Sequence, residues 1–64
     1  MLKKNRLKEL RENKLLSQEK LAELSKVTRQ TIISIEKGKY VPSLELALKF
    51  SKIFKCKVEE IFGI

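Results

Sequence analysis

The chain has 64 residues, of which 15 are Lys or Arg and 8 are Asp or Glu, so its formal net charge at pH 7 is +7. It contains no His and one Cys, and all of its acidic residues are glutamates. These residue types cannot assemble most catalytic sites or metal centres, so we expect a basic protein that is not an enzyme and uses no metal or other cofactor. Because the single Cys56 cannot form an intrachain disulfide, we expect a reducing compartment, the cytoplasm.

The sequence lacks the features of a membrane protein. Its apolar runs are all shorter than the roughly 18 residues that cross a bilayer. The chain becomes charged at Lys3, where a signal peptide would enter its apolar stretch. We therefore expect a soluble, unprocessed chain that forms one domain over residues 1–64. A domain this short buries only about 60% of its unfolded surface, so self-association would add stability.

Apolar residues recur at spacings of three and four along the chain, and sustained alternation is absent. This periodicity predicts an all-helical fold. A first helix is expected over residues 4–14. Ser17 then offers an N-cap oxygen to a second helix over residues 18–25, and Thr28 caps a third helix in the same way.

The third helix is expected to end near Lys37, because Gly38 readily adopts left-handed backbone beyond a helix end. Pro42 disfavours helical backbone at the residue before it. Ser43 caps a fourth helix that runs to about residue 54. A short fifth helix is expected over residues 58–62, and short turns would join all the helices into one domain.

The second and third helices are separated only by Lys26 and Val27 before the Thr28 cap. This connection is too short for antiparallel packing, so the two helices must cross steeply as a helix-turn-helix. On a helical wheel, Ile32 and Ile35 of the third helix point inward. The outward side combines charged, amide, hydroxyl and β-branched groups, namely Arg29, Gln30, Ile33, Ser34 and Lys37. Arginine can donate two bonds to guanine, glutamine can pair with adenine and isoleucine can contact a thymine methyl, so this side is suited to reading DNA bases.

Four segments of the chain together resemble the Cro/phage-repressor (xenobiotic-response-element) helix-turn-helix family of prokaryotic regulators: LSQEKLAE (16–23), VTRQTI (27–32), IEKGKY (35–40) and PSL (42–44). The resemblance covers residues 6 to 62. It implies an all-α, five-helix phage-repressor-like DNA-binding domain in which helices two and three form the helix-turn-helix. It further implies a sequence-specific transcriptional regulator, expected to be a repressor, that binds an inverted-repeat operator in double-stranded DNA as a homodimer with helix three in the major groove.

The resemblance also assigns roles to individual residues. Base reading falls to the start and middle of the third helix, at Thr28, Arg29, Gln30, Ile33 and Ser34. Phosphate binding falls to the start of the second helix and the loop after the third, at Gln18, Lys37, Lys39 and Tyr40. Arg11 and Glu36 are expected to form a structural ion pair, and Ala22 supplies the small side chain expected at the helix crossing.

Four positions depart from the family pattern. Leu15 and Lys26 stand where members often have Gly in a turn, Lys55 where Gly or Asn is frequent, and Lys57 where Ser or Thr usually caps the fifth helix. A non-Gly residue at positive φ costs roughly 1 kcal/mol. These turns are therefore expected either to be slightly strained or to differ in shape from the family norm.

The fourth helix has more apolar surface than one packing contact requires. Its apolar positions span about 220° of the helical wheel, whereas one contact needs somewhat more than 100°. The excess suggests a two-fold dimer contact through Leu48, Phe62 and Ile64; the alternative is full enclosure within the monomer. A dimer would place the two third helices about 34 Å apart, one turn of DNA.

Several features also have simpler interpretations. The charge-rich first 16 residues can be a solvated face, Ile33 can be a stray exposed apolar residue, and Cys56 is expected to be a buried small hydrophobe rather than a redox sensor. The sequence is also compatible with two other functions: an interaction module that captures a protein partner, and a basic amphipathic protein of membrane surfaces. The caps and breakers favour a prefolded domain over the latter, and a regulatory protein partner of a DNA-binding domain stays open.

Overall fold

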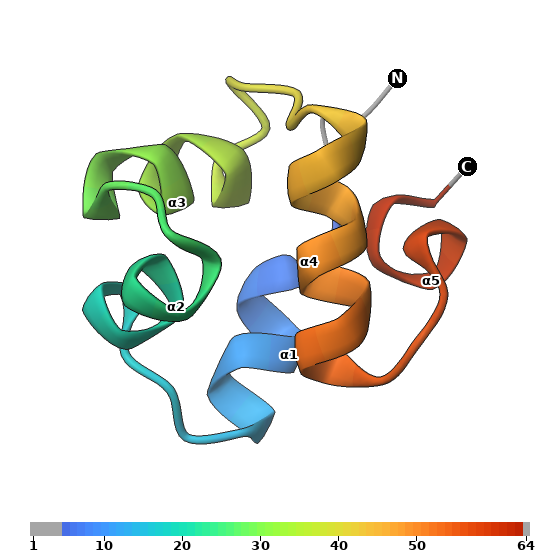
Figure 1. Cartoon of the computed structure of the whole chain (residues 1–64), viewed down its shortest axis with the longest axis horizontal. Helices are drawn as coiled ribbons and strands as arrows, with labels where there is room; N and C mark the ends of the chain where they lie inside the picture. The colour runs from blue at the N-terminus through green and yellow to red at the C-terminus, as the bar shows by residue number, and fades with distance from the viewer. Residues whose placement is uncertain (1–4, 64) are drawn as a thin grey trace.

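The computed structural model describes residues 5–63, which form five α-helices and no strand (Figure 1). The helices are α1 (Leu7–Asn13), α2 (Gln18–Ser25), α3 (Arg29–Glu36), α4 (Leu44–Phe54) and α5 (Val58–Phe62). The all-helical prediction is confirmed, and the bounds of α2 and α5 are those expected. The start predicted for the first helix, at residue 4, lies outside the described residues; α1 begins at Leu7, whose backbone N–H donates to Asn5 Oδ1 at 3.0 Å.

Three hydroxyl side chains cap helices as the sequence predicts. Ser17, Thr28 and Ser43 each have extended backbone and accept a hydrogen bond from the backbone N–H three residues later, at 2.9, 3.3 and 3.2 Å. Each bond satisfies one of the amide groups that a helix start leaves without a partner. The starts of α2, α3 and α4 are therefore fixed by local sequence.

Three of the four positions that depart from the family pattern lie in turns with a left-handed backbone. Leu15, Lys26 and Lys55 have φ values of 59°, 62° and 53°, and Gly38 has 74°. The turns therefore take the shape that favours glycine although three of them carry side chains, at a cost of roughly 1 kcal/mol each. Lys57 precedes α5 as its N-cap residue and has no hydroxyl; its backbone N–H instead donates to the Glu60 carboxylate at 2.7 Å.

The core lies where all five helices meet. Figure 1 shows α2 and α3 on one side of the molecule and α4, α1 and α5 on the other. The fully buried apolar residues come from every helix and are Leu7, Leu21, Ile32, Ile35, Phe50 and Ile61. The rings of Phe50 and Phe62 pack with centroids 6.3 Å apart, which joins α4 to α5. Burial of this set holds the helix-turn-helix pair against the rest of the domain.

Backbone and side-chain bonds also tie the beginning of α1 to its neighbours. The Arg6 backbone N–H donates to the carbonyl of Ile61 at 2.8 Å, and the Asn5 amide donates to the carbonyl of Ile35 at 2.9 Å. The first bond reaches α5 and the second reaches the last turn of α3. Among residues 5–63, no helix has the length and apolar character that a membrane crossing requires.

Candidate nucleic-acid interface

Helix α3 buries one side and presents the other, as the helical wheel predicts. Ile32 and Ile35 are fully buried in the core. Arg29 and Gln30 are exposed at the beginning of the helix, together with the Thr28 cap. Ile33 and Ser34 are half-buried. Of the residues assigned to base reading, Thr28, Gln30 and Ser34 line one hollow and Arg29 lines another.

The loop after α3 folds back beside the helix. The Gly38 backbone N–H donates to the carbonyl of Ile35 and that of Lys39 to the carbonyl of Ser34, both at 2.9 Å. This fold creates a hollow that joins base-reading and phosphate-binding candidates, lined by Thr28, Gln30, Thr31, Ser34, Lys39 and Tyr40. Lys37 is exposed at the end of α3.

The ion pair expected between α1 and the end of α3 is present. Arg11 Nε donates to Glu36 Oε2 at 2.7 Å and Arg11 Nη2 donates to Glu36 Oε1 at 3.4 Å. The two side chains are 10% and 4% exposed. Arg11 Nη1 also donates to the carbonyl of Leu16 at 2.8 Å, so one guanidinium fixes the end of α3 and the approach to α2.

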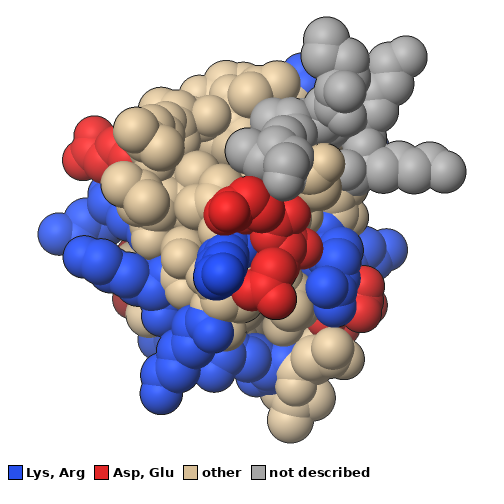
Figure 2. Space-filling view, turned by 90° about the vertical axis from the view of Figure 1, so that its right-hand side faces the viewer, with Lys and Arg blue, Asp and Glu red and all other residues tan. Residues whose placement is uncertain are grey.

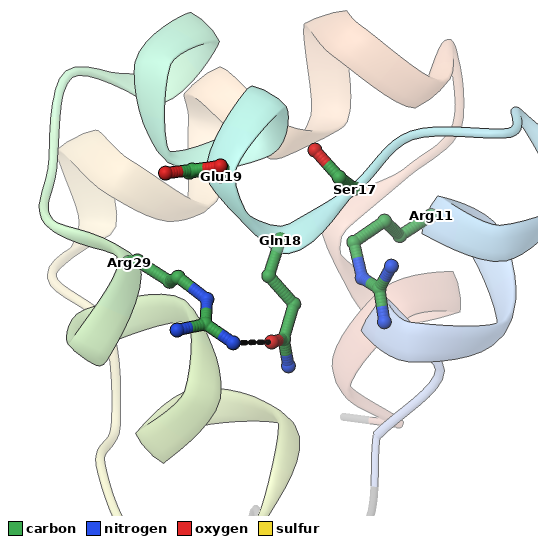
Figure 3. Close-up of a pocket in the computed structure, with 5 residues that line it drawn as sticks. All are labelled: Arg11, Ser17, Gln18, Glu19 and Arg29. Carbon is green, nitrogen blue, oxygen red and sulfur yellow. Dashed lines mark hydrogen bonds between the residues drawn. The ribbon is translucent and has the colours of Figure 1, made fainter.

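Gln18 lies between two arginines at the place where α1, α2 and α3 meet. It projects from the first residue of α2 into a cleft lined by Arg11, Ser17, Glu19 and Arg29 (Figure 3). Its Nε2 donates to Glu36 Oε1 at 3.1 Å, and its Oε1 accepts from Arg29 Nη2 at 3.4 Å. Gln18 was predicted from the family resemblance to bind phosphate, and the structure adds these two protein partners.

Basic residues outnumber acidic ones in the segment that contains α3 and its flanking turns, although exposed Glu19 lies beside Arg29 and exposed Glu45 beside Tyr40. Residues 26–44 contain four basic residues and one acidic residue, Glu36, whose carboxylate is neutralised by Arg11. On the side that carries α5, acidic and basic side chains lie together at the centre, and further lysines and arginines lie along the left, lower and right edges (Figure 2). The outer side of α3 therefore attracts a polyanion through exposed cations.

The residues predicted for a dimer contact lie in different environments. Leu48 is 48% exposed on α4, whereas Phe62 is 2% exposed. Phe62 is not available for the dimer contact that the sequence predicts, because its ring packs on Phe50 inside the core. Ile64 lies outside the described residues. The exposed apolar surface of this region belongs instead to Val41 and Leu44, with Leu48.

Cys56 packs against the core as expected, but it is half-buried and not buried as predicted. Burial, and after it the Glu60 carboxylate, raises the pKa of its thiol. The thiol is therefore protonated and weakly nucleophilic at neutral pH.

The sequence analysis did not identify two residues that line the hollows beside α3 and Gln18. Thr31 lines the hollow beside α3, and its hydroxyl lies 3.0 Å from that of Thr28. Its position three residues after the cap was the available signal, since residues at that spacing share one side of a helix. Glu19 lines the cleft at Gln18, where nothing in the sequence distinguishes it from any acidic residue in a first helical turn.

Comparisons with known proteins agree with this geometry. The family model described as "Helix-turn-helix" matches residues 7–61. The chain is 59% identical over 61 residues to the HTH-type transcriptional regulator YgzD of Bacillus subtilis (strain 168), covering 95% of this chain and 92% of that protein. It is 58% identical over 59 residues to an HTH-type transcriptional regulator of Methanocaldococcus jannaschii, covering 92% and 89%.

A solved structure has the same fold. The crystal structure of the restriction-modification controller protein C.AhdI from Aeromonas hydrophila matches with a TM-score of 0.80 and 40% sequence identity, over 89% of this chain and 86% of that one. Because the family model matches nearly its full length and these relatives cover most of it, the chain belongs to the helix-turn-helix family of DNA-binding transcriptional regulators.

Proposed function

We propose that this protein is a repressor that binds an inverted-repeat operator in double-stranded DNA as a homodimer, with α3 in the major groove. The observation that carries the proposal is the outer side of α3, where Arg29 and Gln30 are exposed beside a loop with free cations. In a prokaryotic cell such a protein acts in the cytoplasm, where the DNA lies.

Base reading is divided between hydrogen bonds and an apolar contact. Arg29 donates to guanine O6 and N7, and Gln30 pairs with adenine N6 and N7. Thr28 and Ser34 add hydroxyl contacts, and the half-buried Ile33 meets a thymine methyl. These side chains project from one rigid helix, which fixes their order along the groove.

Phosphate contacts hold α3 in register on the duplex. Lys37, Lys39 and Tyr40 follow α3 directly, and all three are exposed. Gln18 stands on the opposite flank, at the beginning of α2, where the partial positive charge of a helix start favours an anion. The two flanks would grip the sugar-phosphate strands on either side of the groove.

The dimer is proposed to use the exposed apolar side of α4. Val41, Leu44 and Leu48 are 61%, 73% and 48% exposed, and Leu44 and Leu48 lie one helical turn apart. Covering this patch with a second copy removes apolar surface from water. A two-fold arrangement would then present two α3 helices to successive major grooves, about 34 Å apart.

Repression is the simplest outcome of such binding. A domain that covers promoter DNA excludes other proteins from the same site without any further contact. Activation requires an additional surface that engages the transcription machinery. The charge and hydrogen-bonding groups of the α3 side are accounted for by DNA, so we assign repression.

Selection of bound sequences from a random pool of duplex DNA tests the proposal directly. We expect enrichment of an inverted repeat whose half-sites are centred about 10 base pairs apart. An unpaired half-site would contradict the homodimer, and a pool without enrichment would contradict sequence-specific binding. A reporter gene placed behind the selected operator then measures repression, and increased expression would contradict that assignment.

Two variants separate base reading from phosphate binding. Arg29→Ala should lose about 1 to 3 kcal/mol of binding free energy on the selected site and relax the preference at one base pair. Lys39→Ala should weaken binding to all sequences alike and reduce the slope of log affinity against log salt by about one. Equal losses on selected and scrambled DNA for Arg29→Ala would contradict its assignment.

A further inference from the structure

A continuous chain of hydrogen bonds connects the buried ion pair to the exposed tip of α3. It runs from Arg11 to Glu36, from Glu36 to Gln18, and from Gln18 to Arg29. Figure 3 shows the Gln18 amide between the two guanidinium groups, with the bond to Arg29 drawn. The two ends of this chain differ in environment, since the Glu36 side chain is 4% exposed and Arg29 is exposed.

The donors and acceptors in the chain allow only one orientation of the Gln18 amide. A carboxylate can only accept hydrogen bonds and a guanidinium can only donate them. The NH2 of Gln18 must therefore face Glu36, and its oxygen must face Arg29. Glu36 in turn cannot rotate away, because Arg11 holds both of its oxygens, at 2.7 and 3.4 Å.

We propose that Glu36 is a positioning residue for base recognition, which orients Arg29 through the Gln18 amide without touching DNA itself. The inference rests on the proposed function, because it concerns the direction in which the base-reading arginine points. Arg29 gives one N–H to Gln18 and keeps four further donors, so the held side chain still has donors for a guanine. The specific complex immobilises the Arg29 side chain and so costs conformational entropy. Ordering Arg29 before DNA binds reduces that cost.

Glu36→Gln is the diagnostic change, because it keeps the shape of the side chain and leaves only one accepting oxygen. The charged Arg11 competes best for that oxygen, so the new NH2 group turns toward Gln18. The Gln18 amide must then rotate and present its own NH2 to the Arg29 guanidinium, where two donors meet. We expect the preference at the base pair read by Arg29 to fall by about two- to tenfold.

The swapped double variant tests the polarity of the chain. Combining Glu36→Gln with Gln18→Glu keeps the net charge and restores an acceptor that faces Arg29. We expect the base preference to return to within about twofold of the wild-type value. Twofold is about the smallest effect that ordering one side chain has on affinity. The affinity for all DNA should fall, since a carboxylate now stands near the phosphates.

Glu23→Gln is the matched control. It removes the same charge from a side chain that is 73% exposed and whose ion-pair partner within residues 5–63 is Lys20, at 3.4 Å, so the base preference should be unchanged. A purely structural Glu36 would lower thermal stability in Glu36→Gln and leave the ratio of affinities for matched and mismatched DNA as it was. That result would overturn the proposal, as would failure of the double variant to restore the ratio.

Nuclear magnetic resonance of the DNA-free protein gives a readout that does not depend on the proposed function. The side-chain NH2 signals of Gln18 and the Nε–H signal of Arg29 should shift in Glu36→Gln and stay in place in Glu23→Gln. Unmoved Arg29 signals in folded Glu36→Gln would overturn the proposal that Glu36 orients Arg29. A wild-type protein without sequence preference would refute the proposed function instead.

Should Glu36→Gln fail to fold, Gln18→Leu interrupts the same chain and leaves the buried ion pair intact. Its Arg29 signal should shift, and its preference at the Arg29 base pair should fall by the same two- to tenfold. Preserved preference in folded Gln18→Leu would overturn the proposal.

Discussion

The junction of α1, α2 and α3 and the contact of α4 with α5 differ in the interactions that they add to the apolar core shared by all five helices. Where the first three helices meet, Arg11, Glu36 and Gln18 form a polar cluster with bonds of 2.7 to 3.4 Å. Where α4 meets α5, the contact is between the buried rings of Phe50 and Phe62.

The two kinds of contact serve different purposes. Apolar burial is roughly proportional to area and has no direction, so the α4–α5 contact supplies stability. Hydrogen bonds to charged groups have strict geometry, and a buried ion pair is weak evidence of stability by itself. The cluster of Arg11, Glu36 and Gln18 lies beside Arg29, where direction matters for reading a base.

The largest effect is expected from the apolar side. Phe50→Ala leaves a cavity beside Phe62 and should lower the free energy of unfolding by about 3 to 5 kcal/mol, measured by urea denaturation. At a temperature where the variant is folded, its preference among DNA sequences should match that of the wild type. Lys52→Ala, an exposed change on the same helix, should stay within about 0.5 kcal/mol. A Phe50→Ala protein with altered base preference would show that the two sides are not separate.

The next effect is expected from the polar side. Arg11→Met leaves the Glu36 carboxylate buried without its cation and should lower the free energy of unfolding by about 3 kcal/mol. Arg11→Met combined with Glu36→Leu replaces the pair by apolar groups and should recover most of that loss in the same denaturation experiment. The base preference at the position of Arg29 should stay reduced in the double variant. Recovery of both properties would mean that the polar cluster contributes stability alone.

The smallest effect is expected at the turn between α1 and α2, which belongs to neither contact. Leu15 is 92% exposed and has a φ of 59°. Leu15→Gly removes the strain of a side chain at positive φ but increases the freedom of the unfolded chain. We expect a net gain of about 0.5 kcal/mol in unfolding free energy. Leu15→Ala keeps the strain and should give no gain; an equal gain for both variants would refute strain as the cause.

The helices were predictable because their signals are local. The hydroxyls of Ser17, Thr28 and Ser43 stand directly before helical periodicity, and each one caps a helix. The inward direction of Ile32 and Ile35 follows from a spacing of three residues on one helix. The ion pair of Arg11 with Glu36 needed the family resemblance, since the two residues are far apart in the chain.

The environment of Phe62 was not predictable from the sequence. The wheel of the fourth helix gives the width of its apolar surface but not which neighbour covers each part. In the structure α5 covers Phe50 with Phe62, so the excess apolar surface lies nearer the beginning of α4, at Leu44 and Leu48. The bond from Arg29 to Gln18 could not be predicted from the sequence either, because it depends on how α2 and α3 cross in space.

The bond between the Arg6 N–H and the Ile61 carbonyl places the segment before α1 next to α5. Polypeptide fused before α1 or after α5 would leave the domain from nearly the same point. The order of the helices along the chain can therefore be permuted: a short linker could join residue 63 to residue 5, and new ends could be opened at the strained, exposed Leu15. We expect such a circular permutant to fold with all of its helix contacts intact.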